Sequence, residues 1–247
     1  MNQVIETMLN HRSIRSYEDR PVEQEKLDAI LNCFQQAPNW MNFQLCSAVV
    51  IKDRETREKL ASLSGQPQVA QAPVFIVLCG DFHRVEIAAR KHGVDIGPAL
   101  RYVDEAIVCG HEAGIASEAI TVAAESLGLG TVIIGAIRRA PMEVIKLLNL
   151  PKYVVPILGI CVGYAASNPD LKPRLPREAA VFEERYGENL EKVIDQYDEN
   201  YGNYHMTRSS NQKKETWSDQ ISAYYAQPKE RHTAVAQMLN EQGFSDR

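Results

Sequence analysis

The sequence predicts a fold that mixes α-helices and β-strands, because two kinds of apolar pattern alternate along the chain. Short, continuous apolar runs of strand type lie at residues 47–51, 74–79, 131–135 and 154–162. Segments whose apolar residues recur at helical spacing separate these runs. Such alternation is typical of α/β and α+β folds. We therefore expect a sheet with helices packed against it.

The first half of the chain carries amphipathic helical segments at residues 4–9, 23–37 and 55–63. Asn10 is expected to end the first of them. Pro38 closes the second, since the residue before a proline avoids helical backbone. A turn-forming segment, residues 38–44, then leads into the first strand. Residues 65–67, Gly-Gln-Pro, turn the chain toward the second strand.

The longest helical pattern spans residues 104–127 and is unusually rich in Ala, Gly and Ser. Small side chains let neighbouring backbones pack closely, so we expect this helix to be central or to lie at a subunit contact. Gly128 is its expected C-terminal cap. Pro141 opens a further short helix, and Pro156 interrupts the last strand. Residues 82–103 show no clear period.

The composition changes in the last third of the chain. Residues 168–176 contain three prolines and must run extended or turning. After them we expect a polar helix, a hydrophilic loop and two short helices, at residues 178–206, at 207–215 and on either side of Pro228. This part has too little apolar content to fold alone. We therefore divide the chain into a core, 1–165, and a C-terminal excursion of the same domain, 166–247.

Composition excludes several classes of protein. The 247 residues are 45% apolar and 24% charged, which is ordinary globular usage. A net charge of −5 provides no overall positive field for nucleic acid or an anionic membrane surface. The first residues lack the long apolar core of a signal peptide, and the longest apolar stretches later in the chain stop far short of a membrane span. Five dispersed cysteines argue against a disulfide framework and favour a reducing cytoplasm.

Familiar catalytic motifs are absent or stand in the wrong context. Gly128-Leu129-Gly130 follows a helix and opens a strand, which is the reverse of a dinucleotide-binding loop. His111-Glu112 lacks the second histidine of a zinc-binding H-E-x-x-H motif. No G-x-S-x-G elbow occurs. The sequence therefore offers no support for a hydrolase or for a metal centre.

Two short cationic segments remain as candidate binding residues. His11-Arg12-Ser13-Ile14-Arg15 places guanidinium, imidazole and hydroxyl donors close together, a set that suits a phosphate. Taken alone, the same stretch also fits a solvated charged turn. Lys172-Pro173-Arg174 presents two cations on a backbone stiffened by prolines. On its own this second segment also fits a surface linker.

Considered together and in order, these segments resemble the flavin-dependent nitroreductase superfamily, in its NADPH-dependent nitroreductase A and NADPH:FMN oxidoreductase branch. The likeness extends over almost the whole chain. It is carried by residues 11–15, Ala37-Pro38 with Asn42 and Gln44, Gly65-Gln66, the stretch 123–130, Ile134-Gly135, residues 172–176, Thr207-Arg208 and Thr216-Trp217-Ser218.

The resemblance implies an α+β nitroreductase fold, in which helices flank a central mixed sheet. It further implies a homodimer that binds FMN at the subunit interface, with each C-terminal excursion embracing the other subunit. By the same likeness the core, 1–165, binds FMN. The implied FMN-binding residues are His11, Arg12, Ser13, Arg15, Gln66, Ile133, Ile134, Gly135, Ala136, Lys172 and Arg174, with Asn39, Met41 and Asn42 in the 38–44 loop of the other subunit.

The chemistry expected of this family needs no protein acid or base, since the flavin itself carries hydride. Reduced flavin tends to carry negative charge near N1, so a cation beside N1 and O2 stabilises it. Arg15 is the candidate. The resemblance implies that NADPH binds near Arg208, Lys213, Lys214 and Arg231. Lysine at 213 departs from relatives with arginine there, which keeps the charge and loses the bidentate geometry.

The implied activity is NADPH-dependent reduction of nitroaromatics, quinones or flavins by ping-pong hydride transfer, with no nucleic-acid or membrane partner. Two alternatives stay open at this point. The first is a flavin carrier or storage protein with little turnover. The second is a reductase of the same fold specialised for one metabolite, for which the departure Trp40 in the 38–44 loop is the reason. The sequence does not name the physiological acceptor.

Overall fold

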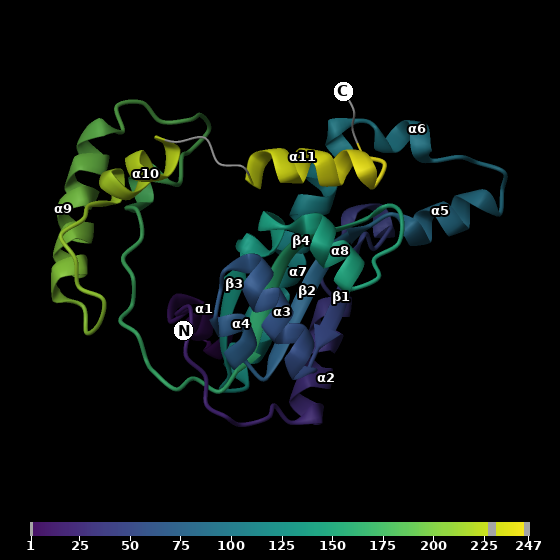
Figure 1. The fold of residues 1–247 in the computed structure, drawn as a ribbon. Helices are drawn as coiled ribbons and strands as arrows, with labels where there is room; N and C mark the ends of the chain where they lie inside the picture. Colours follow the sequence, from purple (N-terminus) through teal and green to yellow (C-terminus); the bar gives the residue numbers. More distant parts are fainter. Residues whose placement is uncertain (1, 227–230, 245–247) are drawn as a thin grey trace. The chain divides into compact units, whose positions relative to one another are not determined.

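The computed structural model describes residues 2–226 and 231–244, and the expected position of Pro228 lies outside them. The chain divides into two compact units. The first contains the chain up to Ser167 together with helix α11 (Arg231–Glu241). The second contains the described residues from Asn168 onward to Ala226. Figure 1 shows the elements of both units.

The first unit is built on a four-stranded sheet. Its strands are β1 (Cys46–Ile51), β2 (Val74–Asp81), β3 (Gly130–Ile134) and β4 (Val154–Gly163), in the spatial order β1-β2-β4-β3. All neighbouring strands pair antiparallel. The parallel component of the expected mixed sheet is confined, within the described residues, to one bridge between Ser13 and Thr131. Each strand appears where an apolar run predicted it, within a few residues.

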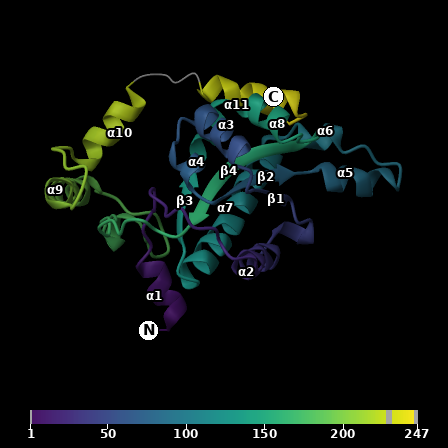
Figure 2. The same ribbon diagram turned by 60° about the horizontal axis from the view of Figure 1, so that its bottom comes forward.

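Helices cover both faces of this sheet (Figure 2). Strand β2 is buried throughout because its side chains alternate between two apolar clusters. On one face Ile76 and Leu78 pack with α2 (Gln24–Gln35) and α7 (Val103–Ser126). On the other face Phe75 and Val77 pack with α3 (Arg54–Ser64), α4 (Gln68–Gln71) and α8 (Pro141–Leu147).

The small residues of α7 explain its central position. A Cβ atom at Gly80 on β2 would lie 2.3 Å from the Cys109 sulfur of α7, so helix and sheet approach more closely than larger side chains allow. Gly128 follows the helix with a φ of 76°, in the left-handed region expected of a C-terminal cap. The prediction of a central helix is therefore confirmed.

The remaining elements of the first unit are short. Helix α1 (Gln3–Leu9) is capped by Asn2 and ends at Asn10, as expected. The region without a clear period forms α5 (His83–Arg90) and α6 (Gly97–Leu100). At Pro156, which cannot donate to a neighbouring strand, the register of β2 against β4 shifts between Leu78 and Cys79.

Helix α11 packs with the first unit rather than with the part of the chain that precedes it. Met238 and Phe244 are buried in a cluster with Phe82 and Val155. The backbone N–H of Tyr153 donates to the carbonyl of Gln242 at 3.2 Å. The last helix is therefore joined to the core by both apolar packing and hydrogen bonding.

The second unit consists of an extended segment, the turn η3 (Arg177–Ala179), and the helices α9 (Glu191–Thr207) and α10 (Trp217–Tyr225). The ring of Tyr197 on α9 contacts Trp217 on α10, and it also contacts Tyr201 one turn further along α9. A reciprocal capping box between Thr216 and Asp219 starts α10.

The expected polar helix over residues 178–206 is wrong in its first half. Helix α9 begins only at Glu191. Glu184 and Asn189 have φ values of 59°, which an α-helix does not accommodate. Phe182 and Tyr186 pack against each other instead, with ring centroids 4.5 Å apart. The polar composition of residues 178–190 predicted a helix, whereas the structure has turns there.

Candidate functional site

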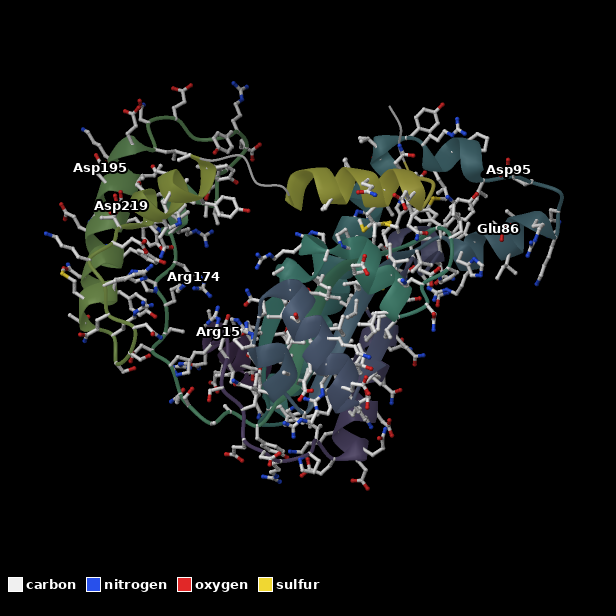
Figure 3. The ribbon with its side chains drawn as sticks, in the orientation of Figure 1. Arg15, Glu86, Asp95, Arg174, Asp195 and Asp219 are labelled. Atoms are coloured by element: carbon white, nitrogen blue, oxygen red, sulfur yellow. The ribbon has the colours of Figure 1, made fainter. Side chains whose placement is uncertain are left out.

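The cationic segment near the start of the chain is attached to the free edge of the sheet. The backbone N–H of Ile14 donates to the carbonyl of Thr131 on β3 at 2.8 Å, and Ser13 bridges the same residue. A Cβ at Gly130 would lie 2.5 Å from Cγ1 of Ile14, so this close approach requires glycine. Figure 3 shows Arg15 on this segment, near α1.

The side chains of this segment form a set of hydrogen-bond donors. His11 Nδ1 lies 2.7 Å from the Glu125 carboxylate. Arg12 Nη1 donates to the carbonyl of Asn10 at 2.7 Å, while its buried Nε has no partner among the described residues. Arg15 is exposed and donates to the carbonyl of Ser13 at 3.3 Å. An unsatisfied buried N–H beside several cationic donors fits an anionic group such as phosphate.

The end of β3 lies directly beside this segment. Ile133 is 46% exposed although its neighbour Ile134 is buried, because successive side chains point to opposite faces. Gly135 and Ala136 open the turn η2 (Gly135–Arg139). Of the predicted site residues 133–136, Ile133 and Gly135 are exposed, Ala136 is half-buried and Ile134 is buried.

Gln66 lies near the turn η2, on the segment that follows α3. It follows the end of α3, where Gly65 has a φ of 64°. Arg139 of η2 donates to the carbonyl of Ser64 at 3.3 Å and so joins η2 to the end of α3. The Gln66 side-chain oxygen accepts a hydrogen bond from Gln68 at 2.6 Å.

The 38–44 loop lies elsewhere in the unit, because it leads into β1 at the other edge of the sheet. Met41, Asn42 and Gln44 all have positive φ, between 49° and 59°, which is unfavourable for these residues. The N–H of Trp40 donates to Glu112 on α7, and the Gln44 N–H donates to Asn39 at 3.3 Å. Within the chain, Asn39, Met41 and Asn42 are thus separate from the β3 edge.

Apart from Arg231, the other predicted cations lie in the second unit. Lys172 and Arg174 lie on the extended segment before α9, where Figure 3 labels Arg174. Arg174 donates to the carbonyl of Lys172 at 3.2 Å. The hydroxyl of Tyr197 donates to the carbonyl of Pro173 at 3.0 Å and fastens the segment to α9.

The loop after α9 carries the residues expected near NADPH. Arg208 Nε donates to the carbonyl of Asn211 at 3.0 Å, and Lys213 forms an ion pair with Glu215. Lys214 is exposed. The side chain of Arg231 lies outside the described residues.

Buried His205 reports the electrostatics of this loop. Its side chain is 1% exposed, and neither ring nitrogen has a hydrogen-bond partner among the described residues. Burial lowers the pKa of His205, and the nearby cations Arg208 and Lys213 lower it further. Burial is thus the main cause of the lowered pKa of His205, and the two cations of the loop add to it while Glu215 opposes them.

Comparison with known proteins decides the family. Residues 8–164 match the nitroreductase family, and residues 172–247 match the C-terminal domain of the nitroreductase family. The chain belongs to the nitroreductase family. Both the resemblance recognised from the sequence and the α+β nitroreductase fold are thereby confirmed.

Relatives in the nitroreductase family match this chain over almost its full length. The chain is 42% identical to an FMN reductase (NAD(P)H) of Bacillus subtilis, over 99% of this chain and 98% of that protein. It is 40% identical to an oxygen-insensitive NADPH nitroreductase of Salmonella typhimurium, over 100% of both.

Solved nitroreductase-family structures agree with the fold. The structure of B. megaterium NfrA2 has a TM-score of 0.96 and 41% identity, and the match covers 100% of both chains. The NADPH:FMN oxidoreductase from Vibrio harveyi complexed with NAD+ has a TM-score of 0.88 and 31% identity, again over 100% of both chains.

Sequence reasoning missed two buried acids of this nitroreductase-family chain. Glu112 was considered only as part of an incomplete metal motif, yet it anchors the 38–44 loop. Glu125 contacts His11 across 114 positions of sequence. Their signal was a charged residue on an otherwise apolar helix, which is rarely buried unless paired. No group of three or more potential metal ligands occurs among residues 2–226 and 231–244.

The thiols and helices complete the description. All five cysteines are free. Burial raises the pKa of Cys46, Cys109 and Cys161 to about 12, so these thiols stay protonated at neutral pH.

In the part of the chain that the structure describes, no helix combines the length and apolar character that crossing a membrane requires.

Proposed function

We propose that this chain is an FMN-containing oxidoreductase that uses NADPH to reduce nitroaromatics, quinones or flavins. The observation that carries the proposal is the donor set of residues 11–15, bonded to β3, whose end exposes Ile133 and Gly135. Full-length relatives named FMN reductase and NADPH nitroreductase support the same activity. They do not favour a storage protein or a reductase restricted to one metabolite.

The residues of the first unit fit FMN by their chemistry. FMN, when bound, supplies the group that accepts and donates hydride. We assign His11, Arg12 and Ser13 to its phosphate and ribityl chain, because cationic and hydroxyl donors converge there. Arg15 would place positive charge at the edge of the ring system near N1 and O2. Gln66 and the residues of the β3 end would face the ring, namely Ile133, Ile134, Gly135 and Ala136.

The second unit supplies further cations of the proposal. We assign Lys172 and Arg174 to the same anion site, on a segment whose prolines limit the entropy lost on binding. Arg208, Lys213 and Lys214 of the second unit, together with Arg231 of the first, are assigned to the 2′-phosphate of NADPH. The support for this second assignment is that three of these cations lie on one loop after α9.

We further propose a homodimer in which the 38–44 loop of one subunit contributes Asn39, Met41 and Asn42 to the flavin site of the other. Helix α1 exposes apolar side chains at Val4, Ile5, Met8 and Leu9, and the loop exposes Met41 and Phe43. Exposed apolar groups of this kind are typical of interfaces. A molar mass measured by light scattering tests the dimer.

The division of the chain is part of the same proposal. We assign 1–165 to an FMN-binding core and 166–247 to an excursion of the same domain that embraces the other subunit. The packing of α11 on the first unit supports a single domain, because the excursion ends on the core. The free cysteines support a reducing compartment such as the cytoplasm.

Two measurements test the activity. The purified protein should be yellow, and NADPH should bleach it when oxygen is excluded. Steady-state oxidation of NADPH with a quinone or nitroaromatic acceptor then separates a reductase from a carrier, which would show no turnover. Colourless protein that cannot be reconstituted with FMN would contradict the proposal. Initial rates with a panel of electron acceptors, at a fixed concentration of NADPH or of NADH, measure the preference for each coenzyme.

A further inference from the structure

Glu125 connects three elements at the cationic segment. It lies near the end of α7, and its side chain is only 13% exposed. One of its oxygens, Oε1, lies 2.7 Å from His11 Nδ1 and accepts a hydrogen bond from the Thr131 hydroxyl at 3.0 Å. Thr131 is also the residue whose carbonyl accepts from the Ile14 backbone.

The geometry determines what the His11 ring can do. An ionised carboxylate is purely an acceptor, so a hydrogen bond to it places a proton on Nδ1. The Thr131 hydroxyl, which also donates to this oxygen, is consistent with that assignment. The other ring nitrogen, Nε2, has no partner among the described residues, and the His11 side chain is 30% exposed. Nε2 is therefore the atom left for a ligand.

The backbone and the side-chain attachments of this segment are separate. Ile14 holds the backbone to β3 whether or not a carboxylate stands at position 125. Within the described residues, the carboxylate of Glu125 bonds only to the side chains of His11 and Thr131. Its removal is therefore expected to release the imidazole ring without detaching the segment from the sheet.

We propose that Glu125 is a positioning residue of the anion site that orients the ring of His11: in the imidazolium form, Nδ1–H donates to the Glu125 carboxylate and Nε2–H donates to the phosphate of FMN. The inference rests on the proposed function, which assigns His11 to that phosphate. Glu125 acts through His11 and does not touch the cofactor. It is thus a determinant of FMN affinity located more than a hundred residues from the segment it organises.

The test compares FMN with riboflavin, which has the same ring system and no phosphate. Glu125→Ala is expected to weaken FMN binding roughly tenfold, the scale of one charge-assisted hydrogen bond, and to leave riboflavin binding unchanged. Glu125→Gln keeps one acceptor oxygen and should restore part of the affinity. Fluorescence quenching of each flavin measures both dissociation constants.

Glu118→Ala is the matched control. Glu118 lies on α7 two turns before Glu125, is exposed, and makes no hydrogen bond or ion pair within the described residues. It should leave the affinity for both flavins unchanged. An equal loss of FMN and riboflavin in Glu125→Ala, or no loss of either, overturns the positioning role.

A double variant tests whether Glu125 acts through His11. If it does, His11→Ala combined with Glu125→Ala should bind FMN no more weakly than His11→Ala alone. Additive losses overturn the inference. Failure of the wild-type protein to bind either flavin would instead contradict the proposed function, so the two failures are distinguishable.

A measurement on the wild-type protein needs no substitution at position 125. Nitrogen-15 NMR of the histidine rings in the FMN complex, with His11 assigned by the loss of its signals in His11→Ala, should show protons on both Nδ1 and Nε2 of His11. A neutral ring overturns the proposal, because one of its nitrogens could not then donate, either to Glu125 or to the phosphate.

Discussion

The two sets of cations in this protein are held in different ways. Residues 11–15 are fixed to β3 by backbone hydrogen bonds, and His11 is held by Glu125. The arginine side chains of both sets donate to carbonyls two or three positions away, so the difference lies in what holds their segments. The first segment is attached to a sheet edge, whereas the second is extended and is fastened to α9 by the hydrogen bond from Tyr197 to Pro173. Substitutions should therefore affect cofactor affinity in the first unit and substrate selectivity in the loop of the second.

The largest effect is expected for the arginine assigned to the flavin ring. Arg15→Ala should weaken FMN binding by roughly 10- to 100-fold, since it removes a charge-assisted donor. Lys172→Ala should have a smaller effect of the same sign, because lysine acts as a point charge. Titration with FMN measures both. Arg101→Ala, which removes an exposed arginine from the first unit, should change nothing. Equal losses in all three variants would mean that only net charge matters.

Gly130→Ala tests whether the sheet really fixes the geometry. The added Cβ would meet Ile14 at 2.5 Å, so the cationic segment must move. We expect the free energy of unfolding to fall by about 1–3 kcal/mol and FMN affinity to fall with it. Denaturant titration provides the measurement. Gly110→Ala is the control, since no atom lies within 4 Å of its added Cβ. Unchanged FMN affinity in Gly130→Ala would show that the attachment of residues 11–15 to β3 does not position them for FMN.

Selectivity is assigned to the loop of the second unit. Arg208→Ala should raise KM for NADPH roughly five- to tenfold and leave KM for NADH unchanged, because only NADPH carries the 2′-phosphate. Lys213→Ala should have a smaller effect, since that lysine is already paired with Glu215. Initial rates with each coenzyme measure the difference. Lys192→Ala, an exposed lysine of α9, serves as the control. A rise in KM for both NADPH and NADH in Arg208→Ala would contradict the assignment of Arg208 to the 2′-phosphate.

The smallest effect concerns pH. Burial, Arg208, Lys213 and Lys172 lower the pKa of His205, and only Glu215 opposes them. Below about pH 6.5 the unfolded chain binds a proton that folded His205 does not. The free energy of unfolding should therefore decrease as pH falls through that value, with a slope of at most about 1.4 kcal/mol per pH unit.

Denaturation of the wild-type protein and of His205→Gln between pH 8 and pH 5 measures this contribution, which the variant should lose. His92→Gln, at an exposed site, should keep it. Identical profiles for all three proteins would show that His205 takes up its proton as easily in the folded state as in the unfolded chain.

Much of the fold could be predicted because its determinants are local. The apolar run at residues 74–79 is a strand buried on both faces, and the small residues of α7 mark close packing against it. The segment 178–190 was predicted wrongly, because its backbone follows aromatic packing between Phe182 and Tyr186 rather than polar composition. Strand pairing could not be read at all, since it depends on contacts between distant residues.

The candidate site divides along the same line. The donors of residues 11–15 are contiguous, so their chemistry is visible in the sequence. Their supports are not contiguous: Glu112 reaches Trp40 from the middle of α7, and Glu125 reaches His11 from near its end. A residue's contribution through a distant partner leaves no local pattern to detect.

The bond between His11 and Glu125 spans 114 positions, which has a consequence for biogenesis. A ribosome has to add all the intervening residues before the carboxylate exists for the imidazole to meet. At about 5–20 residues per second this takes on the order of ten seconds. Until then, the arginines of residues 11–15 have no β3 to hold them in position. Binding of a coenzyme at this segment therefore has to follow the synthesis of β3.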